Sequence, residues 1–479
     1  MKLFAIILLF SSIIYSFPIS LNTIDQKIID YSFNEEFDEA KKLSREQIYE
    51  YPNSPKYYYY YINTTMLEYS QKVRELNSEN RDEGRKKINK ELVDYCQKVL
   101  DKFGDSKFQT EEKFYYGAIY GYLARANGLD GSWWGAFTAG KKAKSIMQEI
   151  ITEDPDFYDA YLLLGMLEYY SDRLSGITSL VASVLGFSGD REKGLRYLEL
   201  AYNKGSLTFG QTALTLIEVY AHLEDNEIAS IKYYRKFLER FPKNKRIYNA
   251  YCHELMNLLD FTSVENIINN DSNNLIKDYT KARFYHTRAQ SDLAIKFAEN
   301  ALADKHNLWR GVAEYSQYII VFNNWLLGNK AKAKQLEILL SDKYKEIFST
   351  VIKNENEAKW LHRFTIEISL GKSVLDIEKF IKTRPAFKSN VELESQFFSL
   401  LGSYYMKTNF LNKAEEAFYN CLKNEDSSVR YSAFKGLIDI YMNINVAKSK
   451  VKNLIDMLED FDNDRLIYRS QDLEKKYRL

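Results

Sequence analysis

The stretch QFFSLLGSYYMKTNFLNKAEEAFYNCLKNED, Gln396 to Asp426, predicts two helices joined by a short turn. In its first half, aromatic, apolar and small residues recur three or four positions apart and so share one helix face. These residues are Phe398, Leu401, Gly402 and Tyr405. After a turn around Thr408 to Leu411, a second stripe consists of Ala414, Phe418 and Cys421. Because Ala414 is small, the two helices can approach closely, and we interpret the stretch as one helical hairpin.

This hairpin resembles the tetratricopeptide repeat, in which an aromatic residue, Leu-Gly and Tyr precede Ala, Phe and usually Pro at fixed spacing. Asp426 stands where the proline would be. The family's interval of twelve residues between the small residue and the proline recurs at Ala40 with Pro52, at Ala143 with Pro155, and at Ser230 with Pro242. The resemblance implies an array of helical hairpins that stack on their neighbours.

A further repeat is expected 34 residues along the chain, because Gly436 follows Gly402 at that interval. Lys435 and Asp439 replace the Leu and Tyr of the pattern, so we interpret this repeat as degenerate. Apolar stripes recur at helical period along the whole chain, and no alternating strand pattern of comparable strength is present. We therefore predict an all-α fold, a tetratricopeptide-like superhelix (α-solenoid), with negligible sheet.

Composition limits the classes of partner. The 479 residues are 45% hydrophobic and 28% charged with only six prolines, which indicates a folded chain with a large core. Basic and acidic residues number 66 each, so the formal net charge is zero. Without a net positive charge the chain has no field to attract nucleic acid, and we expect no nucleic-acid partner.

The N-terminus has the pattern of an export signal. Lys2 precedes an apolar run from Phe4 to Tyr15, which is too short to span a bilayer permanently. We predict a cleaved signal peptide over residues 1–20 and a body exported to the periplasm or secreted. The alternative is an uncleaved anchor, because the usual Ala-x-Ala is missing before the cut. Membrane association of the body is possible but not required.

We expect three helical regions after the signal peptide. The first, residues 21–128, holds N-terminal repeats, and the second, residues 129–264, holds repeats with two unusual segments. The polar stretch Glu265 to Asn274 is the best boundary, because it is rich in turn-forming residues. The third region, residues 275–479, includes the full repeat unit at 396–426.

The first unusual segment is NGLDGSWWGAFTAG, Asn127 to Gly140, whose glycines interrupt the helical pattern. Trp133 and Trp134 either cover a gap in the superhelix or form an exposed pair that binds a partner. We expect at least one of the two rings to be buried.

The second unusual segment begins with a weakly polar insertion at Ser171 to Leu185 and continues with GFSGDREKGLRYLELA, Gly186 to Ala201. Asp190 can cap the helix that follows. We propose that Trp133, Trp134 and the turn with Phe187, Asp190 and Arg191 form one surface that binds a partner.

These segments, with DPDFYDAYLLLGMLEYY between them, resemble the eukaryotic tetratricopeptide family of inclusion-clearance and mitochondrial outer-membrane proteins and its exported bacterial relatives. The likeness covers residues 129–241. It implies an all-helical protein that acts through protein contacts, with no enzymatic residues to carry over. The signal sequence departs from the eukaryotic members.

No pattern for catalysis, cofactor binding or metal binding stands out. The histidines are scattered, without partners at metal-binding helical spacing, and Cys252 and His253 point to different helix faces. Cys96, Cys252 and Cys421 are expected to be buried small hydrophobes. We predict a non-enzymatic, exported adaptor whose concave surface binds a protein or peptide in envelope assembly or transport. The alternative is a membrane-apposed protein that handles lipid or tethers membranes.

Overall fold

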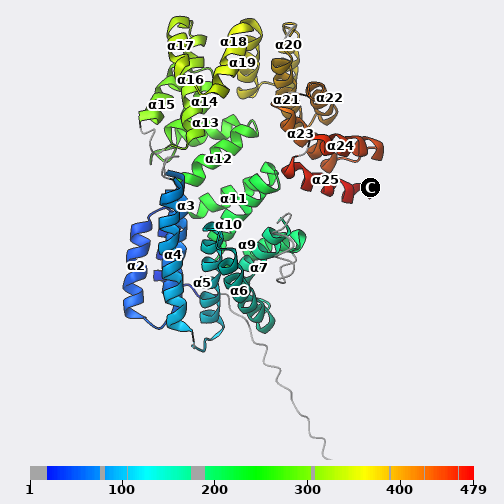
Figure 1. The fold of residues 1–479 in the computed structure, drawn as a ribbon. Coiled ribbons are helices and arrows are strands. Elements are labelled where there is room, and N and C mark those ends of the chain that lie inside the picture. Colours follow the sequence, from blue (N-terminus) through cyan, green and yellow to red (C-terminus); the bar gives the residue numbers. More distant parts are fainter. Residues whose placement is uncertain are drawn as a thin grey trace, which may run out of the picture. The chain divides into compact units, whose positions relative to one another are not determined.

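The computed structural model describes residues 19–75, 81–104, 106–173, 189–303, 308–387, 390–425, 427–461 and 463–479. Several predictions lie outside these residues: the predicted signal peptide up to residue 18, the insertion after Arg173, Phe187, and Asp426 at the proline position. The described residues form helices and no strand, which confirms the all-α prediction (Figure 1). None of these helices has both the length and the apolar character needed to cross a bilayer.

The chain divides into two compact units. Unit 1 comprises residues 1–70 and 85–213, and unit 2 comprises residues 71–84 and 214–479, with the boundary inside α10. The polar stretch Glu265 to Asn274 lies within unit 2, where α13 ends and α14 has yet to begin. The three predicted regions stay a prediction.

The helices up to the boundary are α1 (Thr23–Phe33), α2 (Phe37–Glu50), α3 (Pro55–Glu75), α4 (Arg81–Phe103), α5 (Thr110–Leu129), α6 (Trp133–Glu153), α7 (Ala160–Asp172), α9 (Arg191–Lys204) and α10 (Phe209–Glu218). Those beyond it are the π-helix η1 (Val219–Leu223), α11 (Glu227–Arg240), α12 (Lys245–Asn257), α13 (Phe261–Asn269), α14 (Asp278–Thr287), α15 (Ser291–Ala303), α16 (Arg310–Leu326), α17 (Lys330–Leu336), the 3-10 helix η3 (Glu337–Leu339), α18 (Asp342–Lys353), α19 (Glu355–Ser369), α20 (Val374–Ile381), α21 (Val391–Lys407), α22 (Leu411–Leu422), α23 (Arg430–Asn443), α24 (Lys448–Phe461) and α25 (Asp464–Tyr477).

Many turns within the hairpins share one backbone feature: the second residue after the end of the first helix has the left-handed conformation. These residues are Glu35, Gly131, Asp225, Leu259, Ala289, Gly328, Gly371 and Asn409. At Asn409, the amide of Phe410 donates to the carbonyl of Tyr405 at 2.8 Å, which satisfies a carbonyl at the helix end. Asp225 and Leu259 lie 34 residues apart, the length of one tetratricopeptide repeat.

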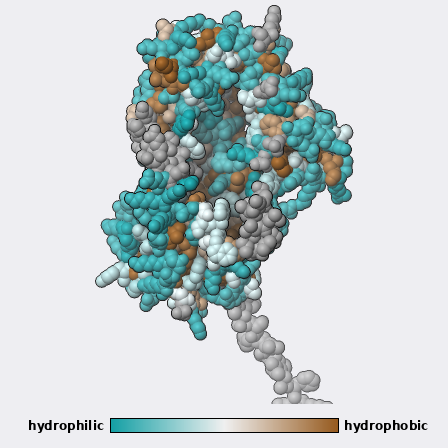
Figure 2. Space-filling view, viewed as in Figure 1, coloured by the Kyte–Doolittle hydropathy of each residue, from teal (hydrophilic) through white to brown (hydrophobic). Residues whose placement is uncertain are grey.

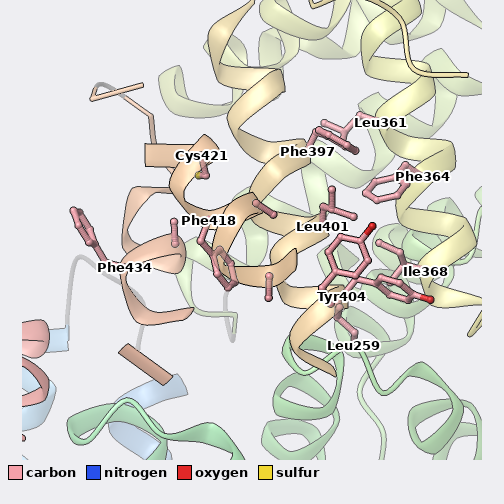
Figure 3. Packing of buried hydrophobic residues seen from close by; sticks show 14 of the residues in the cluster. Leu259, Leu361, Phe364, Ile368, Phe397, Leu401, Tyr404, Phe418, Cys421 and Phe434 are labelled. Atoms are coloured by element: carbon pink, nitrogen blue, oxygen red, sulfur yellow. The ribbon is translucent and has the colours of Figure 1, made fainter. Parts of the chain in front are cut away.

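The hairpin α21–α22 confirms the predicted packing (Figure 3). Phe418 of α22 is buried against Gly402 of α21, where an added Cβ would lie 2.5 Å from the ring. Gly436 of α23 meets the other edge of the same ring. Ala414 and Cys421 are also fully buried. One phenylalanine therefore joins two successive repeats, and it can do so because each repeat supplies a glycine.

Unit 1 buries tyrosines in its core. The run Tyr57 to Tyr60 on α3 is buried, and Tyr59 packs against Phe114 and Tyr115 of α5 with ring centroids 6.2 and 5.4 Å apart. A tyrosine places its hydroxyl at the far end of a large apolar ring, so such a core needs polar partners at its edges. The hydroxyl of Tyr58, for example, donates to the carbonyl of Pro52 at 3.2 Å.

Candidate functional site

The structure places Trp133 and Trp134 in the first turn of α6, and both rings are exposed, at 66% and 72%. The expectation that at least one is buried is wrong. The last buried residue of α5 is Ala126 and the first of α6 is Ala139, so the tryptophans lie where neither helix contributes to the core. Phe137 lies one turn further, with its ring centroid 5.9 Å from that of Trp134.

The glycine-rich break around these tryptophans is shorter than the sequence suggests. α5 continues to Leu129 and α6 begins at Trp133, so only the residues between them lie outside helices. Gly131 provides the left-handed conformation of this turn, and the remaining glycines of the segment lie within the two helices. The segment is thus an ordinary hairpin turn that carries two exposed tryptophans.

Asp190 caps α9, as predicted: its side chain accepts a hydrogen bond from the amide of Lys193 at 2.8 Å. The amide of Asp190 also donates to the carbonyl of Glu168 on α7. At Gly189 a Cβ would collide with the backbone of Asp172, so this glycine permits the close approach of the chain to α7. Part of the GFSGDR element therefore has a packing role. Whether it forms one surface with the tryptophans stays a prediction.

The fold brings together histidines that are far apart in the sequence. His286 of α14 stacks on His362 of α19 with ring centroids 5.4 Å apart, and Asn323 of α16 lies 2.9 Å from Nδ1 of His286. His253 of α12 lies 2.7 Å from the guanidinium of Arg283. Within the described residues, no three His, Cys, Asp or Glu side chains are placed to hold a metal ion.

Burial lowers the pKa of His253 and of His362 to about 3, and that of His286 to about 4. These rings are therefore neutral at pH 7 and act as hydrogen-bonding and stacking groups. The three cysteines are buried with free thiols, as predicted, and burial raises the pKa of each to about 12. Such thiols are poor nucleophiles.

The group of charged side chains that the structure adds lies in unit 2, where α23 and α25 return to α11 (Figure 1). We call it the closing cluster, and its members are Asp225, Glu227, Glu254, Tyr431, Lys435, Asp439 and Arg469. Lys435 forms ion pairs with Glu227 and, at 3.8 Å, with Asp225. The hydroxyl of Tyr431 donates to Asp225 Oδ2 at 2.7 Å. These contacts join residues more than 200 positions apart.

Arg469 of α25 binds the same turn before α11 and also binds α23. Its guanidinium donates to the carbonyls of Glu224 and Asp225 at 3.3 and 2.8 Å, and to Asp439 at 2.6 Å. The two carbonyls follow the end of η1, so the arginine satisfies acceptors that a helix end leaves open. Arg469 is buried, and it joins the turn before α11 to both C-terminal helices, α23 and α25.

Buried carboxyl groups give the cluster unusual electrostatics. Burial raises the pKa of Glu254 to about 7, and the neighbouring Glu227 raises it further, whereas a hydrogen bond from Asn257 and the charges of Lys435 and Arg283 lower it. Burial also raises the pKa of Glu227 itself, although Lys435 opposes this. A carboxyl with a pKa near 7 holds a proton for a substantial part of the time at neutral pH.

Two departures from the repeat pattern pointed to this cluster, and the repeat interpretation did not use them. Lys435 and Asp439 are the two residues that depart from the repeat pattern around Gly436, and both lie in the cluster. Asp225 and Glu227, the partners of Lys435, lie in the turn before α11 and at the first residue of α11, where charged residues are common. The pairing therefore became visible only when the fold brought α23 next to α11.

Comparisons with known proteins give no family. No family model matches the chain, and no curated protein matches it. Among solved structures, the human IFIT1 dimer with PPP-AAAA is 13% identical with a TM-score of 0.26, and covers 84% of this chain and 95% of its own. The APC/C hetero-tetramer Cut9-Hcn1 is 12% identical with a TM-score of 0.24, covering 92% and 85%. At these values the neighbours carry no information on what this chain binds.

Proposed function

We propose that this chain is a tetratricopeptide-like scaffold that binds a protein partner through the exposed Trp133 and Trp134, with the half-buried Phe137 beside them. The observation that carries the proposal is the exposure of both tryptophans at 66% and 72%. A large aromatic ring left in water is costly, and adjacent exposed aromatic residues commonly mark interfaces. Tryptophan is also among the residues that contribute most to binding energy, because it buries a large area with few rotatable bonds.

A second surface for an extended segment of a partner is the hollow of unit 2. Figure 2 shows this hollow with mainly hydrophilic residues (teal) inside it. Aromatic and polar side chains of three helices meet in this unit: His286, Phe322 and His362.

Export to the periplasm or outside the cell, and a role in envelope assembly or transport, are parts of the same proposal. They are supported by Lys2 and the apolar run Phe4 to Tyr15, which have the order of a secretory signal. The relation of residues 129–241 to the inclusion-clearance family also stays a prediction. Nucleic acid is not among the partners we propose, because the formal net charge is zero.

The double variant Trp133→Ala, Trp134→Ala tests the proposed contact. Because both rings are exposed, we expect a melting temperature close to that of the wild type, with at most about 0.5 kcal/mol lost for each substitution. Affinity purification from the native host should then lose one or more partners that the wild type captures.

The matched control is Trp309→Ala, because Trp309 is another exposed tryptophan, at 57%, and lies in unit 2. It should retain the partners that the double variant loses. Capture of the same partners by the double variant and the wild type would contradict the proposed contact. A large fall in melting temperature would show that the tryptophans belong to the core.

A membrane-apposed protein is the second candidate. Lys141 and Lys142 are exposed on the same helix as the tryptophans, and indole rings beside basic residues suit the interface of an anionic bilayer. Flotation with phosphatidylserine-containing liposomes separates the candidates. Binding that is lost in the double tryptophan variant would favour the membrane, whereas no flotation of the wild type would remove this candidate.

A further inference from the structure

Ile19, the first residue that the structure describes, belongs to the core of unit 1. It is 5% exposed, and its carbonyl accepts a hydrogen bond from the hydroxyl of Ser206 at 3.2 Å. Ser206 lies in the loop between α9 and α10, 187 positions further along the chain and in the same unit. The end of the predicted export signal, residues 1–20, therefore overlaps with this core.

The loop that binds Ile19 is held in place by a buried carboxylate. Asp159 is 3% exposed, and its Oδ1 accepts hydrogen bonds from the amide and the hydroxyl of Thr208, both at 2.8 Å. Its Oδ2 accepts a hydrogen bond from the amide of Ser206 at 3.4 Å. The hydroxyl of Ser206 lies 3.5 Å from the same oxygen but 3.2 Å from the carbonyl of Ile19, so its single hydrogen has the shorter contact with Ile19. The fold therefore fixes the position of the group that binds Ile19.

The helix that follows, α1, is bound to the same unit at its first turn. The amide of the capping residue Asn22 donates to Asp25 Oδ2 at 3.0 Å, and the side chain of Asn22 accepts from the amide of Asp25 at 2.8 Å. Asp25 is fully buried and forms an ion pair with Lys56 of α3 at 2.6 Å. Because two residues separate Ile19 from Asn22, Ile19 and the first turn of α1 form one continuous packed segment.

This packing distinguishes two positions for the cut of the export signal. Two small residues near the end of the signal can precede a cut, Ser16 and Ser20. A cut after Ser20 removes Ile19 together with its contacts in the core. It also places the new α-ammonium group on Leu21, next to the capping residue of α1, where the positive end of the helix dipole repels it. A cut after Ser16 has neither effect.

We propose that the export signal is cut after Ser16, on the N-terminal side of Ile19, and that the exported chain keeps Ile19 in the core of unit 1. A signal of 16 residues lies within the usual length of about 15–30 residues. The host's signal peptidase catalyses the hydrolysis: water cleaves the peptide bond between Ser16 and Phe17 and leaves a carboxylate on Ser16 and an ammonium group on Phe17. The inference rests on the export proposed above, and it moves the predicted end of the signal from residue 20 to residue 16.

The first residue of the exported chain tests the position of the cut. The complete precursor is expressed in a Gram-negative bacterium, and the mass of the intact protein in the periplasmic fraction gives its N-terminus. We expect a chain that begins at Phe17. A periplasmic chain that begins after Ile19 would overturn the inference and leave export in place. An uncut chain would also overturn it, and recovery of that chain from the cytoplasm would remove export as well.

Two matched variants of the precursor test which serine precedes the cut. Ser16→Leu places a bulky residue at the proposed cut and should leave most of the precursor uncut, because signal peptidases require a small residue there. Ser20→Leu is the control: Ser20 is exposed in the folded unit, and the variant should be cut like the wild type. Normal processing of Ser16→Leu together with loss of processing in Ser20→Leu would place the cut after Ser20 and overturn the inference.

Thermal melting of the two alternative mature chains measures what the retained segment contributes. Chains that begin at Phe17 and at Leu21 are each released from a fusion by a protease that leaves the native first residue. We expect the shorter chain to melt about 3–10 °C lower, because it loses one buried isoleucine and gains a charge beside the start of α1. In the longer chain, Ile19→Ala should lower the melting temperature and Ser20→Ala should leave it unchanged. Equal melting of the two chains would show that Ile19 does not belong to the core and would overturn the inference.

Discussion

The hairpins α21–α22 and α23–α24 follow each other in the chain but use the repeat pattern in different ways. Each hairpin contributes one glycine that packs on the ring of Phe418. This glycine is Gly402 in α21–α22 and Gly436 in α23–α24. The first keeps the apolar residues beside its glycine, with Leu401 and Tyr405 buried. The second has Lys435 and Asp439 at the corresponding positions, and these side chains bind Glu227 and Arg469 instead.

This difference shows what a departure from a repeat pattern can indicate. α23 still stacks on its neighbour, because Gly436 is retained, so the charged residues do not mark a failed repeat. They mark a helix that has two contacts to make, one with the preceding repeat and one with residues more than 200 positions earlier. In a stacked array the first kind of contact is local and the second is not.

The largest expected effect on stability comes from the packing between the two successive hairpins. Phe418→Ala removes a ring that packs against both glycines and leaves a cavity between two repeats, so we expect a loss of about 3–5 kcal/mol in the free energy of unfolding. Urea unfolding followed by circular dichroism measures it. Phe410→Ala is the control, because Phe410 is exposed at the turn of the same hairpin and should cost less than about 1 kcal/mol. Equal losses in the two variants would mean that the ring of Phe418 does not link the repeats.

The second expected effect on stability comes from the ion pairs of α23 with residues far away in the sequence. Lys435→Leu with Asp439→Tyr restores the residues of the repeat pattern but removes the partners of Glu227 and Arg469. We expect a loss of about 1–3 kcal/mol, because the cluster is mostly buried and its remaining charges become uncompensated. Urea unfolding at pH 6 should show it, and Lys413→Leu, which breaks an exposed ion pair on α22, should cost no more than about 0.5 kcal/mol. A gain in stability would show that these positions prefer the apolar residues of the pattern.

The sequence predicted the hairpins because their causes are local. Residues three or four positions apart, such as Leu401 and Tyr405, show which helix face is buried, and the spacing of Ala414 and Phe418 shows the partner helix. The neighbouring Phe397 is more deeply buried than the predicted Phe398, which packs at the edge of the core. A periodic pattern thus predicts the buried face of a helix better than the individual residue that fills it.

The candidate sites were less predictable, for two physical reasons. The exposure of Trp133 and Trp134 depends on how far the helices extend past their last buried residues, and sequence period does not show this. The closing cluster depends on which helices meet after many repeats, and small rotations between repeats accumulate along the array. Lys435 and Asp439 indicated that polar contacts replace the usual apolar packing on this helix. The sequence pattern did not predict that their partners are Asp225, Glu227 and Arg469.

The smallest expected effect compares the turns of the same two hairpins. Asn409 has φ of 62° and follows α21, whereas α23 ends at Asn443 and continues into the extended Ile444. Asn409→Gly should stabilise the fold by about 0.3–1 kcal/mol, because glycine has no Cβ atom to clash in the left-handed conformation. Asn443→Gly should destabilise it by about 0.5–1 kcal/mol, because Asn443 is helical and its side-chain Nδ2 donates to the carbonyl of Asp439 at 2.8 Å. Thermal melting of the two variants shows whether each substitution raises or lowers the stability of the fold. Changes of the same sign would mean that the turn after α23 also contains a residue in the left-handed conformation. Opposite signs would show that the second hairpin departs from the repeat in its turn as well as in its charges.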